Sequence, residues 1–135
     1  MNRSLNIAAD VEEFARNTVD AIYHLHRELG PGLLESVYST FLEEELRHRS
    51  LPYMREIALP VTYRNRRMDI GFRADFVVGS SVLLELKAVE ALQPVHRAQV
   101  ITYLKISRLP LRSLVNFNVP LVKDGMHRLF NPDLT

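Results

Sequence analysis

Hydrophobic positions recur at helical spacing in the first third of the chain and then change to the alternation that is typical of strands. Apolar residues from about 9 to 28 fall on one face of a helix, and Gly30-Pro31-Gly32 ends it. A second helix is predicted from about residue 34 to 48. Residues 1–8 precede this pattern and are expected to form a loose N-terminus.

After Leu51-Pro52 the pattern predicts three strands, a helix and a further strand. Arg64-Asn65-Arg66 marks a turn between the first two strands, and Pro94 opens the helix, which is predicted to end near residue 107. The strands are expected at residues 57–63, 68–78, 82–87 and 111–117, with a short strand or turn within 119–130. This order predicts one α/β domain over residues 1–135, in which helices flank a small mixed β-sheet with a β-hairpin.

Composition narrows the class of protein without naming a function. The chain has 135 residues, of which 47% are hydrophobic and 24% charged, and its net charge is +1, so only a local basic patch can attract a polyanion. It has no cysteine, which excludes disulfides, thiolate zinc sites and a cysteine nucleophile. No apolar run resembles a signal peptide or a membrane span. We therefore expect a soluble cytoplasmic protein that does not enter membranes.

Candidate chemistry lies on the third predicted strand. Because strand side chains alternate, Glu85 and Lys87 share one face, whereas the side chain of Leu86 points to the other. A tight turn at Gly79-Ser80-Ser81 is expected to bring Asp75 of the preceding strand beside Glu85. Two carboxylates and an amine at the end of a small sheet are suited to hold a divalent cation and an activated water.

Polar residues on two predicted helices add to this set. Glu35 and Tyr38 are three residues apart and therefore adjacent on one helical face. In the later helix, His96, Gln99 and Tyr103 recur at spacings of three and four. Both helices are interrupted by polar and aromatic residues in the way expected of helices that flank a buried polar site.

Gly32-x-x-Glu35-x-x-Tyr38 matches the motif that names the GxxExxY protein family, which this chain resembles. Further matching segments follow in order: Arg73-Ala74-Asp75, Glu85-Leu86-Lys87-Ala88, His96-x-x-Gln99, Tyr103-Leu104-Lys105, Asn116-Phe117 and Lys123-Asp124-Gly125. That family is similar to the PD-(D/E)XK nuclease superfamily, so the resemblance implies a restriction-endonuclease-like core. Ala74 stands where the superfamily name has proline, and Ser113 stands where the family more often has glycine.

The resemblance implies a nuclease whose divalent cation, Mg²⁺ or Mn²⁺, is held by oxygen atoms. Its ligands are expected to be Asp75, Glu85, Glu35 and the backbone carbonyl of Leu86. Lys87 is expected to orient the attacking water and to stabilise charge on the phosphate. Gln99 and Tyr103 are expected to assist at the same catalytic site.

The implied substrate is nucleic acid, DNA more than RNA, and a local group of basic residues is available to contact its phosphates. These residues are Arg64, Arg66, Arg67, Arg73, His96 and Arg97. A small nuclease core with few recognition elements is also expected to work with a partner, and a homodimer is one such arrangement.

Two alternative interpretations of the function stay open. Glu-x-Lys on a strand is commonly a solvated ion pair, and arginines at a hairpin turn commonly form an exposed tip. The first alternative is a non-catalytic module that keeps the fold and binds nucleic acid or metal without cutting. The second is a protein-interaction or assembly protein whose acids balance the charge of a buried lysine.

Overall fold

The structure is a computed structural model that describes the backbone of residues 2–107, 109 and 111–130. Side chains are described for residues 10–103, 105, 106, 109 and 111–128. Residue 1 and residues 131–135 of the predicted domain therefore lie outside the described residues. The helices and strands are α1 (Asn2–Leu29), α2 (Glu35–His48), β1 (Tyr53–Tyr63), β2 (Arg66–Val78), β3 (Val82–Lys87), α3 (Pro94–Ser107), β4 (Leu111–Asn116), η1 (Val122–Gly125) and β5 (Met126–Phe130).

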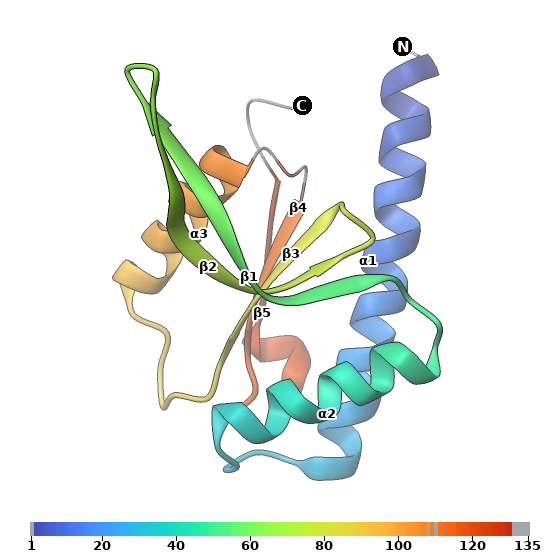
Figure 1. The fold of residues 1–135 in the computed structure, drawn as a ribbon. Coiled ribbons are helices and arrows are strands. Elements are labelled where there is room, and N and C mark those ends of the chain that lie inside the picture. The colour runs from blue at the N-terminus through green and yellow to red at the C-terminus, as the bar shows by residue number, and fades with distance from the viewer. Residues whose placement is uncertain (1, 108, 110, 131–135) are drawn as a thin grey trace.

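The five strands form one sheet in the order β1-β2-β3-β4-β5, in which β3 and β4 are parallel and the other neighbours antiparallel. Figure 1 shows α1 and α2 on one side of this sheet and α3 on the other. The predicted mixed α/β fold, with a small sheet, a β-hairpin and flanking helices, is confirmed. None of the helices within the described residues is long and apolar enough to cross a membrane.

The first helix begins earlier than the pattern predicts, because α1 starts at Asn2 and continues to Leu29, whereas the predicted start lies near residue 9. These residues contain neither glycine nor proline, so nothing in the backbone opposes helix formation before residue 9. The apolar pattern begins near residue 9, close to Val11 and Ala15, which are buried in the core.

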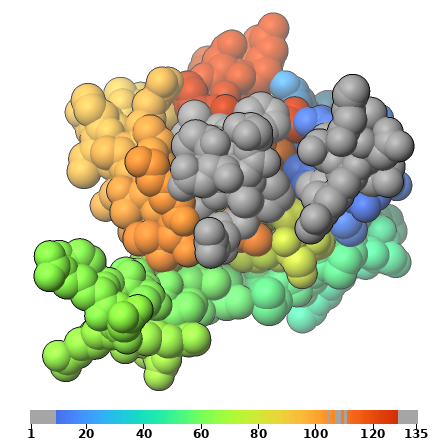
Figure 2. Space-filling model, turned by 90° about the horizontal axis from the view of Figure 1, so that it is seen from above, coloured from blue at the N-terminus to red at the C-terminus, as the bar shows by residue number. Residues whose placement is uncertain are grey.

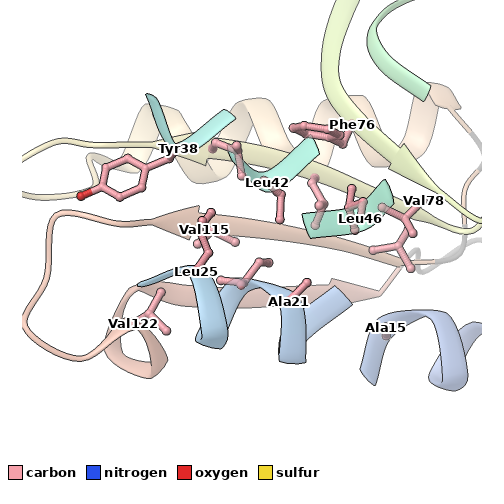
Figure 3. Close-up of a cluster of buried hydrophobic side chains, with 14 of the residues drawn as sticks. Ala15, Ala21, Leu25, Tyr38, Leu42, Leu46, Phe76, Val78, Val115 and Val122 are labelled. Carbon is pink, nitrogen blue, oxygen red and sulfur yellow. The ribbon is translucent and has the colours of Figure 1, made fainter. Parts of the chain in front are cut away.

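The main core lies between the sheet and the pair α1 and α2. Buried side chains from both helices meet those of the sheet, as Figure 3 shows for Leu25 of α1, Leu42 of α2 and Val115 of β4. Leu84 and Leu86 point into this core, whereas Leu83 belongs to a smaller cluster with Tyr103 of α3. The alternation predicted for β3 is therefore confirmed, and it places Glu85 and Lys87 on the face that α3 covers.

The β1–β2 hairpin is longer than the strands beside it. β2 pairs with β3 only from Phe76 to Val78, so the rest of β2 pairs with β1 alone. The predicted turn at Arg64-Asn65-Arg66 is observed at Arg64 and Asn65, whereas Arg66 already begins β2. Arg64 and Asn65 adopt positive φ angles of 48° and 66°. Figure 2 shows this hairpin projecting from the body of the molecule.

Candidate active site

The candidate site lies where β2 and β3 separate. Their ladder ends at the pair Phe76–Leu84, so Asp75 and Glu85 would be the next pair but are not joined through their backbones. The side chain of Asp75 bonds to β3 in place of the backbone, because its Oδ2 accepts a hydrogen bond of 2.7 Å from the backbone N–H of Leu86. The Asp75 carboxylate is thereby fixed against the end of β3, beside Glu85.

Glu85 is a buried carboxylate without full compensation. Glu85 is only 7% exposed, and within the described residues its Oε1 has no hydrogen-bond partner. Burial raises the pKa of Glu85 to about 8, and repulsion from Asp75 acts in the same direction. Arg112 and Lys87 lower this pKa in turn, so both cations lie near the carboxylate. An unpaired buried oxygen next to a second carboxylate is an arrangement that a divalent cation would relieve.

Glu35 and Lys87 complete the predicted group of four. Partial desolvation raises the pKa of Glu35, the Lys87 ammonium opposes this shift, and the Asp75 carboxylate reinforces it. Glu35 therefore interacts with β2 and β3 although it is the first residue of α2. Lys87 is half-buried at the end of β3 and interacts with Glu35 as well as Glu85. The fold thus brings together the four charged residues that the sequence placed on three separate elements.

A cleft of about 340 Å³ opens beside these residues. It is lined by Glu35, Ser36, Ser39, Arg55, Glu56, Asp75 and Leu86. Glu56 was not predicted as a site residue, because it lies on a strand whose sequence gives no sign of the cleft. Its φ of 51° is unusual for a residue other than glycine and interrupts the regular pairing of β1 opposite Asp75. Glu56 therefore adds an exposed carboxylate to the cleft that Asp75 and Glu35 also line.

Tyr38 explains how the chain holds Glu35 in place. Its hydroxyl donates a hydrogen bond of 2.5 Å to the carbonyl of Gly30 and accepts one of 3.3 Å from the N–H of Leu33. Its ring is fully buried and stacks on Phe117 at 4.4 Å. Gly32 has a φ of 93°, a conformation that other residues rarely adopt, and lets the chain turn into α2. Gly32 and Tyr38 therefore position the helix that begins with Glu35.

Arg112 is a functional candidate that the sequence did not reveal. It is fully buried on β4, and its Nε, Nη1 and Nη2 atoms have no hydrogen-bond partner among the residues that the structure describes. Its guanidinium carbon lies 5.6 Å from the centre of the Tyr103 ring, which in turn stacks on Phe72 at 4.1 Å. Burial lowers the pKa of Arg112 to about 10, whereas Glu85 raises it. An arginine within an apolar strand gives no sequence signal of this proximity.

Gln99 and Tyr103 lie farther from the chemistry than the four charged residues. Gln99 is exposed on α3, and no hydrogen bond within the described residues joins it to Asp75, Glu85 or Lys87. Tyr103 is half-buried and approaches the site through Arg112. Their assignment as catalytic residues stays a prediction, and the structure favours a positioning role for Tyr103.

The predicted nucleic-acid contacts fall into two groups. Arg64, Arg66, Arg67 and Arg73 are exposed on the β1–β2 hairpin, whereas His96 and Arg97 begin α3. The Nδ1 atom of His96 accepts a hydrogen bond of 2.9 Å from the N–H of Gln93, which caps α3. Arg97 lies 2.9 Å from the Nδ1 atom of His127 on β5. Both α3 residues therefore already have partners within the protein.

Asn116 bonds to the backbone through both polar atoms of its side-chain amide. Its Oδ1 atom accepts a hydrogen bond of 3.1 Å from the N–H of Val89, and its Nδ2 donates one of 2.9 Å to the carbonyl of the same residue. Asn116 also pairs in register with Lys87. It therefore holds the segment that leaves β3 immediately after the Glu85-Leu86-Lys87 sequence.

The donor atoms suit a hard divalent cation, since Asp75, Glu85 and Glu35 offer carboxylate oxygens and the buried Oε1 of Glu85 has no partner in the described part of the chain. Across the described part of the chain, however, no three histidine or acidic side chains are already grouped as metal ligands. The oxygen donors of Asp75 and Glu85 are adjacent, and Glu35 approaches from α2. A cation held by all of them therefore requires the side chains to draw together when it binds.

Comparison with known proteins gives one family match for this chain. No curated protein and no solved structure matches the chain. A family model described as the PD-(D/E)XK nuclease superfamily matches residues 12–129, which include both separating strands, α2 and α3. Members of that superfamily generally use divalent metals and act on nucleic acid. The match covers most of the chain, and the chain therefore belongs to the PD-(D/E)XK nuclease superfamily.

Proposed function

We propose that this protein is a metal-dependent phosphodiesterase that hydrolyses nucleic acid, with DNA as the expected substrate and Mg²⁺ or Mn²⁺ as the cation. The observation that carries the proposal is the convergence of Glu35, Asp75, Glu85 and Lys87 at the separation of β2 and β3. Three carboxylates near one another repel unless a cation compensates them. Without a ligand, these acids would have a lower free energy if they were separated and solvated by water.

In this proposal Asp75, Glu85, Glu35 and the carbonyl of Leu86 hold the cation. A cation held there would polarise the phosphodiester and lower the pKa of the attacking water. Asp75 is oriented for this task by the Leu86 N–H, and the burial of Glu85 excludes water from one side of its carboxylate. The Lys87 ammonium, which interacts with both Glu35 and Glu85, is placed to orient the attacking water and to stabilise negative charge on the phosphate.

The test is cleavage of labelled single- and double-stranded DNA and RNA in Mg²⁺ or Mn²⁺. We expect Asp75→Asn, Glu85→Gln and Lys87→Met each to lower the rate by about 10²–10⁴-fold, the range typical of a lost charge-stabilising or proton-transfer group. Glu44→Gln and Lys105→Met remove an exposed or partly exposed charge of the same kind outside the site and serve as matched controls.

Cleavage that persists undiminished in Glu85→Gln and Lys87→Met would remove this mechanism. Absence of cleavage on all four nucleic acids, with Mn²⁺ binding intact by calorimetry, would instead favour a non-catalytic module of the same superfamily. One observation supports this second candidate: within the described residues, no three histidine or acidic side chains are already grouped as metal ligands.

A further inference from the structure

The β1–β2 hairpin carries apolar side chains that the fold does not bury. Tyr63 is 71% exposed, Met68 is 59% exposed and Ile70 is 70% exposed. Side chains of this size are normally covered in a soluble protein when they lie close together. All three belong to the part of the hairpin that extends beyond β3 and that Figure 2 shows projecting from the body.

The same part of the hairpin is rich in positive charge. Residues 61–73 include four arginines and a single acidic residue, Asp69, although the chain as a whole has a net charge of only +1. Arg67 is paired with Asp69 at 3.0 Å, and Arg64 lies over the ring of Tyr63 at 5.6 Å. Arg66 has no carboxylate partner within the described residues. Apolar groups beside uncompensated arginines suit a polyanion that also offers apolar surface.

The register shows that the two kinds of side chain share a face. Tyr63 lies opposite Arg66, and Val61 lies opposite Met68, so these four side chains point to one side of the ribbon. Thr62 and Arg67 pair on the other side. A ligand on the first face would therefore meet an aromatic ring, a thioether and a guanidinium together.

The hairpin is built to keep this shape without a ligand. Positive φ angles at both turn residues, Arg64 and Asn65, are those of the tight two-residue turn that matches the twist of antiparallel strands. Nearer the body, a Cβ atom on Gly71 would lie 2.0 Å from Cγ2 of Val61, so the absence of a side chain there lets the strands approach. The arm is thus an ordered ribbon rather than a loose loop.

We propose that this ribbon binds in the major groove of double-stranded DNA, an inference that rests on nucleic acid being the substrate. The two strands lie about 4.8 Å apart, and the major groove of B-DNA, about 12 Å wide, admits a two-stranded ribbon with its side chains. The arginines contact phosphates on the groove walls, and Met68 and Ile70 meet apolar base edges. The major groove of double-stranded RNA is too narrow and deep for such an arm. The ribbon therefore selects DNA over RNA and duplex over single strand.

A second copy of the chain is the rival occupant of the apolar face. A symmetric contact between two arms would bring the arginine-rich tips of both copies close together or leave the positive charge uncompensated. A duplex neutralises that charge and covers the apolar groups at the same time. Charge complementarity therefore favours DNA.

The experiment measures nucleic-acid binding in EDTA, because chelation of divalent cations separates binding from cleavage. Fluorescence anisotropy would be measured at several salt concentrations with one sequence as DNA duplex, RNA duplex and DNA single strand. Wild type is expected to bind the DNA duplex at least about fivefold more tightly than the other two. The triple variant Arg64→Asn, Arg66→Thr, Arg67→Thr should weaken duplex binding about tenfold and reduce the salt slope by about 2.7, because each of the three lost phosphate contacts removes about 0.9. Asparagine at position 64 keeps a residue that tolerates positive φ.

A matched control removes three exposed cations elsewhere, with Arg16→Ser, Arg27→Ser and Lys123→Ser on α1 and η1, and should stay within about twofold of wild type. Met68→Thr with Ile70→Thr should weaken duplex binding with an unchanged salt slope. Equal affinity for the three nucleic acids, or wild-type affinity in the arginine variant, would overturn the inference. So would a dimer, seen by sedimentation, that disappears in the Met68 and Ile70 variant while DNA binding persists. Failure to cleave, with duplex binding intact, would count against the phosphodiesterase alone.

Discussion

At the scale of single residues, the surroundings of Glu85 act on its pKa in opposite directions. Folding places its carboxylate among apolar groups, beside Asp75, while Arg112 and Lys87 supply only partial compensation. A buried acid in these surroundings favours its neutral form, and its pKa is raised to about 8. A cation bound beside Glu85 would therefore lower the free-energy cost of keeping its carboxylate ionised.

The pH dependence of stability follows from this pKa. Because the pKa of Glu85 in the folded protein lies above its unfolded value of 4.5, the folded state holds the proton more tightly between pH 4.5 and about 8. The associated stability is fully present below pH 4.5 and is lost as pH rises through 8, with a total on the order of a few kcal/mol. We expect urea denaturation in EDTA to show the free energy of unfolding falling between pH 5 and 8 in wild type but much less in Glu85→Gln. A Glu44→Gln control that lost the dependence equally would refute the assignment.

Arg112 should be energetically coupled to Glu85. At pH 9 the Glu85 carboxylate is largely ionised, so removal of the nearby guanidinium leaves a buried charge without its counterpart. A double-mutant cycle with Arg112→Met and Glu85→Gln is expected to give a coupling free energy of about 1–3 kcal/mol at pH 9 and a smaller one at pH 6. Chemical denaturation of the four proteins at both pH values measures it. A coupling that is zero at both would show that the two side chains act independently.

The residues of the site differ in how well the sequence alone predicts them. Glu85 and Lys87 were predictable because strand alternation fixes which side chains share a face. Arg112 was not, since only the parallel pairing of β3 with β4 brings it near Glu85. Glu56 was not predictable either, because its contribution depends on a backbone irregularity opposite Asp75.

At the scale of secondary-structure elements, the segment between α1 and α2 shows how a short motif acts at a distance. Tyr38 bonds the chain at Gly30 and Leu33, so the first turn of α2 cannot shift without breaking those bonds. Glu35 is the first residue of that helix and interacts with β2 and β3 across the cleft. The motif that begins at Gly32 therefore positions an acid rather than supplying chemistry through every residue.

Tyr38→Phe tests this view. Losing the hydroxyl leaves the Gly30 carbonyl and the Leu33 N–H without their partner, at a cost of about 1–2 kcal/mol in the free energy of unfolding. Hydrogen exchange of the amides in residues 30–37 should accelerate, while those of β4 stay protected. Tyr23→Phe removes a hydroxyl from an exposed ring of α1 and is the control. Unchanged exchange in residues 30–37 would mean that the hydroxyl does not hold the segment.

At the scale of the whole molecule, the site joins elements that are far apart in the sequence. Glu35 belongs to α2, Asp75 to β2 and Glu85 to β3, while Arg112 approaches from β4. A cation held by Glu35, Asp75 and Glu85 would therefore link α2 to the sheet. Ligands that bind only the folded state stabilise it as a whole.

Divalent cations should consequently raise the melting temperature. At a concentration about ten times the dissociation constant, Mg²⁺ or Mn²⁺ is expected to add about 1.4 kcal/mol to the free energy of unfolding and to raise the melting temperature by a few degrees. EDTA should reverse the shift, and Asp75→Asn should abolish it. Differential scanning calorimetry measures both, with the exposed-acid variant Glu13→Gln as control. A shift of equal size in Asp75→Asn would place the cation elsewhere.

The sequence by itself determined the order of helices and strands, the hairpin turn and the shared face of Glu85 and Lys87, because these follow from local periodicity and turn chemistry. It also contained the motifs through which the superfamily is recognised. Only the tertiary structure decided that β2 and β3 separate at Asp75 and that a buried arginine lies beside Glu85. It alone showed that the hairpin extends beyond the sheet with its apolar side chains exposed. These features depend on contacts between distant segments, which the pattern along one strand or helix does not specify.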